Sequence, residues 1–248
     1  MTEQPTYVYG VLSADARAPQ IAGIGAAPLR EVASDGVAAL VSDLADRELV
    51  FGRDEVTTHA RVLEQTLEHA TVLPMRFGVV MEGDTAVKEH LLDAHHDELI
   101  RQLDELRGKV ELRVRAVYEE EQVMREVLME DPEIQRLRDR LRDAPDDATY
   151  YGRIQLGELV ANALEHKRAA DAARILEALE PFALASHVGE PANERIVISG
   201  SFLVEHQAMA TFDEVVDALG RAHAGRIRIK YTGPLPPHSF VNLNATEA

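Results

Sequence analysis

The sequence predicts an α+β protein built from two domains. Three observations predict this class. Runs of β-branched or alternating residues occur in both halves of the chain, helical periodicities separate these runs, and a glycine that can end a helix lies near the middle, at Gly108. A length of 248 residues suits one large domain or two small ones. We therefore expect an N-terminal α+β domain over residues 1–108 and a C-terminal domain over residues 109–248.

A strand and a β-hairpin open the predicted N-terminal domain. Residues 7–12 are rich in aromatic and β-branched side chains, which predicts the first strand. Residues 19–28 contain prolines and glycines and are expected to form a loop. The Asp-Gly dipeptide at 35–36 separates two short apolar runs, 29–32 and 37–41, and this pattern is typical of a tight hairpin turn.

Two helices follow, with an irregular strand between them. The first helix is expected to begin at Arg53, and the second to end near Arg107. Residues 71–81 between them have strand character, although Pro74 confines them to an edge or an irregular start. The apolar face expected of the first helix is Val56, Ala60, Leu63 and Leu67, and that of the second is Val87, Leu91, Leu92, Leu99 and Leu103.

The predicted C-terminal domain starts with the most regular strand of the chain, residues 110–118, where apolar and charged side chains alternate. A charged helical segment follows and is broken at Pro132. This strand and the elements that follow it in the sequence predict a modified ferredoxin-like βαββαβ domain. Residues 119–147 are then expected as a helical insertion in the first crossover of that domain. The later elements are expected as a turn over 143–147, a helix over 150–180, strands over 182–188 and 196–204, a helix over 212–222 and a strand over 226–231.

The chain is strongly acidic and lacks cysteine. It has 26 Lys and Arg residues against 43 Asp and Glu residues, a formal net charge of −17. Such a chain repels phosphate backbones, so we expect no nucleic-acid partner. The absence of cysteine excludes disulfides, thiolate chemistry and iron–sulfur clusters, and it favours a reducing compartment.

Nothing in the sequence predicts export or a membrane anchor. Residues 1–6 contain one acid and no Lys or Arg, so no signal peptide is expected. The most apolar windows, 71–81 and 196–204, are shorter than the roughly 20 residues that a bilayer-spanning helix needs. We expect a cytoplasmic protein with no membrane contact.

Sequence motifs for catalysis are missing. The segment Gly23-Ile-Gly-Ala-Ala-Pro28 only approximates a dinucleotide-binding loop, because proline stands where the third glycine belongs. Neither a phosphate-binding Walker sequence nor a nucleophile elbow occurs. We therefore expect no enzyme activity, no catalytic residue, no cofactor and no small-molecule substrate.

One histidine-rich segment has a spacing that could suit a metal ion. On a helix, His90, Asp93 and Asp97 would share one face. The same segment lies opposite the apolar side chains of that helix, so a solvated polar face is the favoured interpretation. We expect no metal site.

Two further segments are unusual. Residues 73–78, Leu-Pro-Met-Arg-Phe-Gly, place Arg76 in an apolar run, and we predict that it forms a buried ion pair. Residues 232–241 contain three prolines, which fix φ and remove backbone donors. This tail is expected to lie across a surface rather than join a sheet, either as a clasp over the C-terminal sheet or as a docking surface for another protein.

Six segments, in their order and spacing, resemble one known family, the gas vesicle protein L/F family (GvpL/GvpF), over nearly the whole chain. Leu235 and His238 depart from the pattern, since the family more often has aromatic residues at these positions. The six segments are Tyr7-Val-Tyr-Gly-Val11, Val41-Ser-Asp43, His59-Ala-Arg61, Val72-Leu-Pro-Met-Arg-Phe-Gly78, Lys109–Tyr118 and, most specifically, Thr232-Gly-Pro-Leu-Pro-Pro-His-Ser-Phe-Val241.

The resemblance implies a non-enzymatic role in gas vesicles, the gas-filled protein shells of prokaryotic cytoplasm. Members of this family are accessory or minor structural proteins, thought to act early in shell assembly by binding the small hydrophobic shell protein or other accessory proteins. The family fold is two α+β domains, the second a modified ferredoxin fold. The motif positions that the resemblance marks as structural or partner-binding are Pro74, Arg76, Phe77, Gly78, Gly233, Pro234, Pro237 and Phe240.

Two other classes of function stay open at this point. A small-molecule-binding regulatory protein is one, because ferredoxin-like domains often bind ligands. A metal-dependent enzyme using residues 90–98 is the other. For the assembly role, we expect the strands at 110–118 and 226–231 to offer open sheet edges to a shell subunit, together with the rigid tail.

Overall fold

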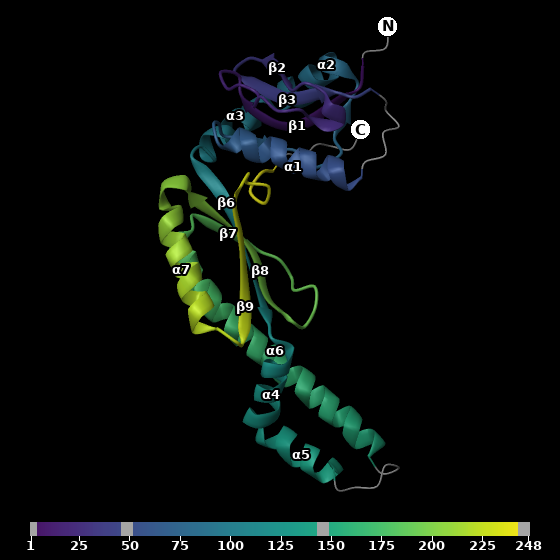
Figure 1. Ribbon diagram of the computed structural model, residues 1–248, viewed down its shortest axis with the longest axis vertical. Coiled ribbons are helices and arrows are strands. Elements are labelled where there is room, and N and C mark those ends of the chain that lie inside the picture. Colours follow the sequence, from purple (N-terminus) through teal and green to yellow (C-terminus); the bar gives the residue numbers. More distant parts are fainter. Residues whose placement is uncertain (1–3, 46–51, 143–148, 243–248) are drawn as a thin grey trace. The chain divides into compact units, whose positions relative to one another are not determined.

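The computed structural model describes residues 4–45, 52–142 and 149–242. Over these residues the chain is a mixed α/β fold with two antiparallel sheets and seven α-helices (Figure 1). It forms two compact units. The first runs to Glu111 and includes the residues from Gly233 onward, and the second runs from Leu112 to Thr232. These bounds differ from the predicted domains mainly in the tail, which belongs to the first unit.

The sheet of the first unit is built around its opening strand. Strand β1 (Thr6–Ser13) pairs antiparallel with β3 (Val37–Asp43), and β3 pairs with β2 (Arg30–Ser34). On the other side of β1 lie two short strands, β4 (Leu73–Pro74) and β5 (Val80–Met81). Every residue of β1 before its last is buried, so this strand is the centre of the core.

The hairpin between β2 and β3 forms where the sequence predicts it. Asp35 and Gly36 have φ angles of 37° and 87°. Left-handed conformations at both turn positions match the right-handed twist of the paired strands, which is why Asp-Gly is favoured there. The register sets Ser34 opposite Val37.

The predicted strand at 71–81 is divided into β4 and β5 by a loop over residues 75–79. Pro74 pairs with Gly10 of β1, and it has no N–H to offer a further strand. The strand therefore ends at the proline, and the chain leaves the sheet before it returns at Val80.

The helix α1 (Arg53–Leu67) buries a different face from the one predicted. Val56 is 47% exposed, whereas the buried positions follow the i, i+3, i+4, i+7 spacing of one helical face. The prediction counted apolar residues alone, but two polar side chains are buried because they are hydrogen-bonded; Thr66 Oγ1, for example, donates to the Val62 carbonyl at 2.7 Å. The buried residues of α1 are His59, Val62, Leu63 and Thr66.

The second predicted helix is interrupted. It consists of α2 (Gly83–Ala86), a π-helical segment (Val87–Asp93) and α3 (His96–Glu105). Gly108 follows with φ of 68°, a conformation that suits glycine at the end of a helix. The apolar face predicted for this region is nevertheless buried throughout, at Val87, Leu91, Leu92, Leu99 and Leu103.

The sheet of the second unit has the order β7-β8-β6-β9. Its strands are β6 (Lys109–Tyr118), β7 (Ala185–Val188), β8 (Ile196–Glu205) and β9 (Ile227–Leu235). Because β6 lies between β8 and β9, the prediction that residues 110–118 form an open edge is wrong. Alternation of apolar and charged residues shows that the two faces of a strand differ in polarity. It carries no information about whether other strands pair with its two edges. The open edges are β7 and β9.

Four helices accompany this sheet: α4 (Glu120–Glu130), α5 (Pro132–Arg142), α6 (Tyr150–Leu179) and α7 (Met209–Ala222). Helix α4 ends just before Pro132, as predicted, and α4 and α5 pack against α6 (Figure 1). The predicted turn at 143–147 lies outside the described residues. In the part of the chain that the structure covers, no helix is long and apolar enough to cross a bilayer.

The C-terminal tail begins inside the sheet. Residues 232–235 are the end of β9, so the expectation that the tail avoids sheets is wrong for them. Strand β9 is an edge strand, where proline is tolerated. From Pro236 onward the chain leaves the strand and packs within the first unit.

Candidate functional site

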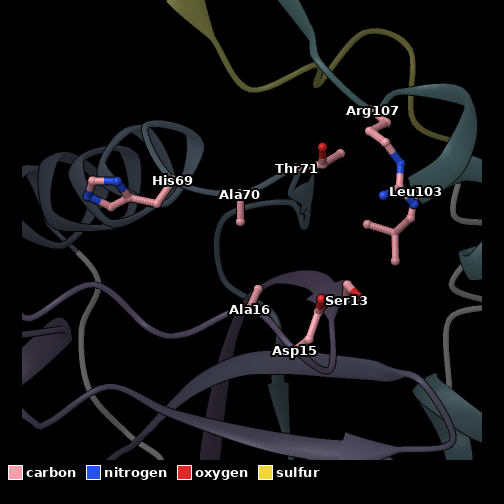
Figure 2. Close-up of a pocket in the computed structure, with 8 residues that line it drawn as sticks. All are labelled: Ser13, Asp15, Ala16, His69, Ala70, Thr71, Leu103 and Arg107. Atoms are coloured by element: carbon pink, nitrogen blue, oxygen red, sulfur yellow. The ribbon is translucent and has the colours of Figure 1, made fainter.

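An open hollow of about 310 Å³ in the first unit is one candidate site (Figure 2). Its polar lining includes Asp15, His69 and Arg107. The pKa of the Asp15 carboxyl is lowered, first by a hydrogen bond from the Ser13 side chain, whereas a catalytic acid needs a raised pKa. Arg107 is already paired with Asp104 at 2.5 Å. The hollow therefore shows no acid–base or nucleophile arrangement.

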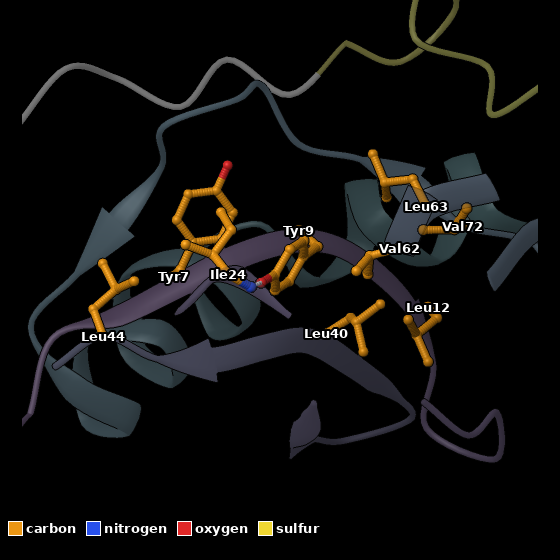
Figure 3. Close-up of a cluster of buried hydrophobic side chains, with 9 residues drawn as sticks. All are labelled: Tyr7, Tyr9, Leu12, Ile24, Leu40, Leu44, Val62, Leu63 and Val72. Carbon is orange, nitrogen blue, oxygen red and sulfur yellow. Dashed lines mark hydrogen bonds between the residues drawn. The ribbon is translucent and has the colours of Figure 1, made fainter. Parts of the chain in front are cut away.

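A buried aromatic and polar cluster in the same unit connects several segments of the chain. Figure 3 shows Tyr7 and Tyr9 of β1 among the apolar side chains of the core. The Tyr9 hydroxyl lies 2.9 Å from Ser42 Oγ and accepts the Ile24 N–H at 2.8 Å. Burial raises the pKa of Tyr9, so this hydroxyl stays neutral and holds the loop before β2 against β1.

The second tyrosine joins its own strand to two other segments. The Tyr7 hydroxyl lies 2.9 Å from His59 Nδ1 and accepts the Gly78 N–H at 3.0 Å. The His59 ring stacks on Tyr9 with the centroids 5.7 Å apart. Strand β1, helix α1 and the loop over residues 75–79 are thereby fixed to one another.

Both titratable groups of this pair are neutral near pH 7. Burial, followed by the charge of His238, lowers the pKa of His59 to about 4. Burial raises the pKa of Tyr7 to about 12. Neither group can exchange a proton readily near neutrality, so the pair supports the fold and is unsuited to acid–base catalysis.

The loop that this pair supports presents two side chains to solvent. Phe77 is 37% exposed, while its ring still contacts His59 at 5.7 Å and Tyr7 at 6.2 Å between centroids. Arg76 is exposed, so the prediction of a buried ion pair is wrong. The apolar run predicted a buried strand, but Pro74 ends the strand and the following residues turn outward.

Gly10 lets strand β4 approach β1 closely. A Cβ at this position would lie 2.8 Å from the Leu73 carbonyl oxygen, closer than side chains normally come. Only glycine therefore fits here without a shift of the backbone. The requirement connects two of the segments that carry the family resemblance, residues 7–11 and 72–78.

The C-terminal tail belongs to the same unit. Ser239 donates its N–H and its hydroxyl to the Glu111 carboxylate at 2.7 and 3.0 Å, and this carboxylate is fully buried. The Asn242 N–H donates to Gln102 Oε1 at 2.9 Å. Of the tail positions marked by the resemblance, Gly233 and Pro234 are exposed, Pro237 is buried and Phe240 is half-buried.

Comparison with known proteins decides the family. A family model described as "Gas vesicle synthesis protein GvpL/GvpF" matches residues 5–242. The chain belongs to the GvpL/GvpF family. It is 37% identical over 240 residues to gas vesicle protein F of Streptomyces sp. (strain CB03234), covering 95% of this chain and 99% of that protein. It is 24% identical to gas vesicle protein F of Dolichospermum flosaquae, covering 97% and 99%.

Solved structures of GvpL/GvpF proteins have the same fold. The crystal structure of GvpF from Anabaena sp. PCC7120 matches with a TM-score of 0.86 at 21% identity, covering 97% of this chain and 99% of that one. GvpF from Microcystis aeruginosa matches with a TM-score of 0.79 at 21% identity, covering 96% and 99%. Membership of the family supports a role related to gas vesicles, and the relatives carry names of gas vesicle proteins rather than of enzymes.

The described residues of this member of the GvpL/GvpF family do not support the alternative of a metal-dependent enzyme at residues 90–98. Across residues 4–45, 52–142 and 149–242, no group of three or more His, Asp or Glu side chains could hold a metal ion. Asp93 instead accepts a hydrogen bond from Ser34 Oγ at 2.5 Å. His96 Nε2 lies 2.7 Å from the Asp35 carbonyl oxygen. The segment 90–98 therefore contacts the β2–β3 hairpin of its own unit.

The second unit contains a buried charged network that no sequence motif predicted. Asp171 is 1% exposed and accepts hydrogen bonds from the Tyr118 hydroxyl at 2.6 Å and from Arg226 Nη2 at 2.5 Å. Burial alone would raise the pKa of Asp171, but these two donors hold it below its usual range. Arg226 also bonds Glu126, at 2.8 Å, and Lys167 lies 3.1 Å from the same carboxylate. These charges neutralise one another, so the network favours a structural role over a ligand site.

A helical signal could have found His59, the residue that organises the first cluster. His59 precedes Val62 and Leu63 by three and four positions, which places it on their face of α1. Asp171 likewise shares a helical face with Ile175 and Leu179, four and eight positions later, but its hydrogen-bond partners lie 53 and 55 residues away in sequence.

Proposed function

We propose that this protein acts in gas vesicle assembly by binding the small hydrophobic shell protein at a surface of its first unit. We call this surface the Phe77 surface and define it by Arg76, Phe77 and Gly78. The observation that carries the proposal is an exposed phenylalanine on a buried, hydrogen-bonded base. Other accessory proteins of the gas vesicle are the second class of partner that family membership favours.

The physical properties of this surface suit a protein partner. Aromatic and arginine side chains are the commonest energetic centres of protein interfaces. The Tyr7–His59 pair holds the main chain at Gly78, so little conformational entropy is lost when a partner contacts Phe77. Within the family-resemblance segment, residues 76–78 are thus held in place by the buried core and are also exposed to solvent.

The charge of the whole chain suits a carrier of an apolar subunit. Shell subunits that are small and apolar tend to associate with one another, and a partner must cover part of their surface. A formal net charge of −17 keeps a loaded complex dispersed by mutual repulsion. A cytoplasmic, non-enzymatic role fits these properties.

We also infer that the second unit is a modified ferredoxin-like domain. The element order β6, α4–α6, β7, β8, α7, β9 and the strand order β7-β8-β6-β9 support this inference. Helices α4 and α5 are then the insertion in the first crossover. A small regulatory ligand has weaker support, because the hollow described above is open and mostly polar, unlike the enclosed apolar cavities that bind such ligands.

Co-expression tests the proposed function. The shell protein is produced with this chain carrying an affinity tag, or with an unrelated acidic protein carrying the same tag. We expect the shell protein to remain in the supernatant and to co-purify with this chain alone. Equal recovery with both tagged proteins, or recovery with neither, would contradict the proposal.

A further inference from the structure

Strand β7 (Ala185–Val188) is an open edge of the second sheet. It pairs antiparallel with β8 on one side, and no strand within the described residues pairs with its other side. All four of its residues are exposed. Two apolar side chains beside it are exposed as well, Phe182 at 41% and Leu184 at 55%.

This edge lacks the charges that normally keep edge strands apart. Edge strands that stay unpaired usually carry charged residues or prolines on the open side. The opposite edge of the same sheet does so, since Arg228 and Lys230 of β9 are exposed. Residues 182–189 instead contain no Asp, Glu, Lys, Arg or Pro, in a chain whose net charge is −17. Two acidic chains can therefore approach each other here with little repulsion.

The main chain of β7 has its free groups at the right positions for pairing. The Gly189 N–H donates to the Ser199 carbonyl of β8 at 3.0 Å. Main-chain groups alternate in direction along a strand, so residues 186 and 188 direct theirs to the open side. A second strand can thus exchange two hydrogen bonds with Ser186.

We propose that two copies of this chain associate through β7, antiparallel, with the two-fold axis at Ser186. The symmetry places Leu184 opposite Val188 of the second copy, and Ala185 opposite His187 of the second copy. Val188 is 41% exposed in the single chain, and the pairing covers both apolar side chains. Glu190 falls opposite Phe182 in this register, so no two carboxylates meet.

A single engineered thiol tests this geometry directly, because the chain contains no cysteine. Ser186→Cys places the two sulfurs across the axis, where paired Cα atoms lie about 5.5 Å apart, within the range of a disulfide. Ala161→Cys, at an exposed position of α6, is the matched control. Under mild oxidation we expect the Ser186→Cys chain to form a covalent dimer at least tenfold faster than the control chain. Equal rates would overturn the proposal.

Sedimentation supplies a second measurement without any thiol. The interface is small, so the monomer–dimer equilibrium is followed from about 1 µM to about 300 µM, the range expected for weak association. We expect dimers of the wild-type chain and monomers of Val188→Lys, with unchanged circular dichroism. A wild-type chain that is monomeric at every concentration would overturn the proposal. If, in addition, Val188→Lys no longer captures the shell protein, the β7 edge would be assigned to that partner instead of a second copy.

Discussion

The Tyr7 hydroxyl lies 2.9 Å from His59 Nδ1 and joins β1 to α1 across 52 residues of sequence. The hydroxyl also accepts the Gly78 N–H at 3.0 Å. One phenol thereby connects the central strand, the first helix and the loop that exposes Phe77. The proposed partner surface depends on this connection.

Removal of the phenol oxygen should destabilise the first unit. Tyr7→Phe leaves the ring in the core but deprives His59 Nδ1 and the Gly78 N–H of their partner. An unsatisfied buried polar group costs about 1–3 kcal/mol, and we expect this loss in urea denaturation. Tyr151→Phe, on a side chain that is 82% exposed, is the control and should change nothing. Equal stability of the two variants would show that the Tyr7–His59 contact contributes little.

Acid should weaken the fold through His59. Its pKa is about 4 in the folded chain against 6.5 for an unperturbed histidine, so the folded state prefers the neutral ring. This contribution is complete above pH 6.5, decreases as the pH falls, and is lost below about pH 4. The difference of 2.5 units corresponds to on the order of 3 kcal/mol.

The variant His59→Phe isolates that contribution from the carboxylates. It keeps every other titratable group, including Tyr7, Tyr9 and His238, which face the imidazole. We expect the free energy of unfolding of the wild-type chain to fall more steeply between pH 6.5 and pH 4 than that of the variant. Parallel pH profiles would exclude His59 as the responsible group.

The buried network of the second unit should respond strongly to loss of one partner. Asp171→Ala removes the acceptor of Tyr118 and Arg226, and breaking a buried pair costs about 3–5 kcal/mol. The double variant Asp171→Leu with Arg226→Met replaces the charges by apolar volume and should recover most of the loss. Thermal denaturation measures both. No recovery in the double variant would show that packing, not the stranded charge, dominates.

The tail should act as a clasp on its own unit. Ending the chain at Leu235 removes the two Ser239 donors from the buried Glu111 carboxylate. We expect a lower melting temperature for this truncated chain, and a smaller decrease when it also carries Glu111→Leu, which removes the buried charge. If truncation leaves the melting temperature unchanged, residues 236–242 have no clasp role.

Local structure follows from local chemistry, and the sequence therefore predicts much of it. The Asp-Gly turn at 35–36, the helix break at Pro132 and the alternation of β6 are each set by residues within a few positions. By contrast, the order of the family-resemblance segments does not reveal that residues 7–11 and 72–78 meet at Gly10.

Features that depend on distant partners were not accessible in this way. The edge or centre position of β6 depends on strands more than 70 residues away. The helical period places His59 and Asp171 on the buried faces of α1 and α6, but it does not reveal the hydrogen-bond partners in other elements that make their burial possible. Exposure of Arg76 depends on where Pro74 ends the strand, a boundary that composition does not fix.

Binding of the shell protein by matched variants measures the role of the Phe77 surface. Affinity is measured for the wild-type chain, Phe77→Ala, Arg76→Glu and the control Met129→Ala, whose side chain is 66% exposed in the second unit. Circular dichroism confirms that each variant is folded. We predict at least tenfold weaker binding for the two surface variants, about 1.4 kcal/mol or more, and unchanged binding for the control. Wild-type affinity in folded Phe77→Ala and Arg76→Glu chains would contradict this role of the Phe77 surface.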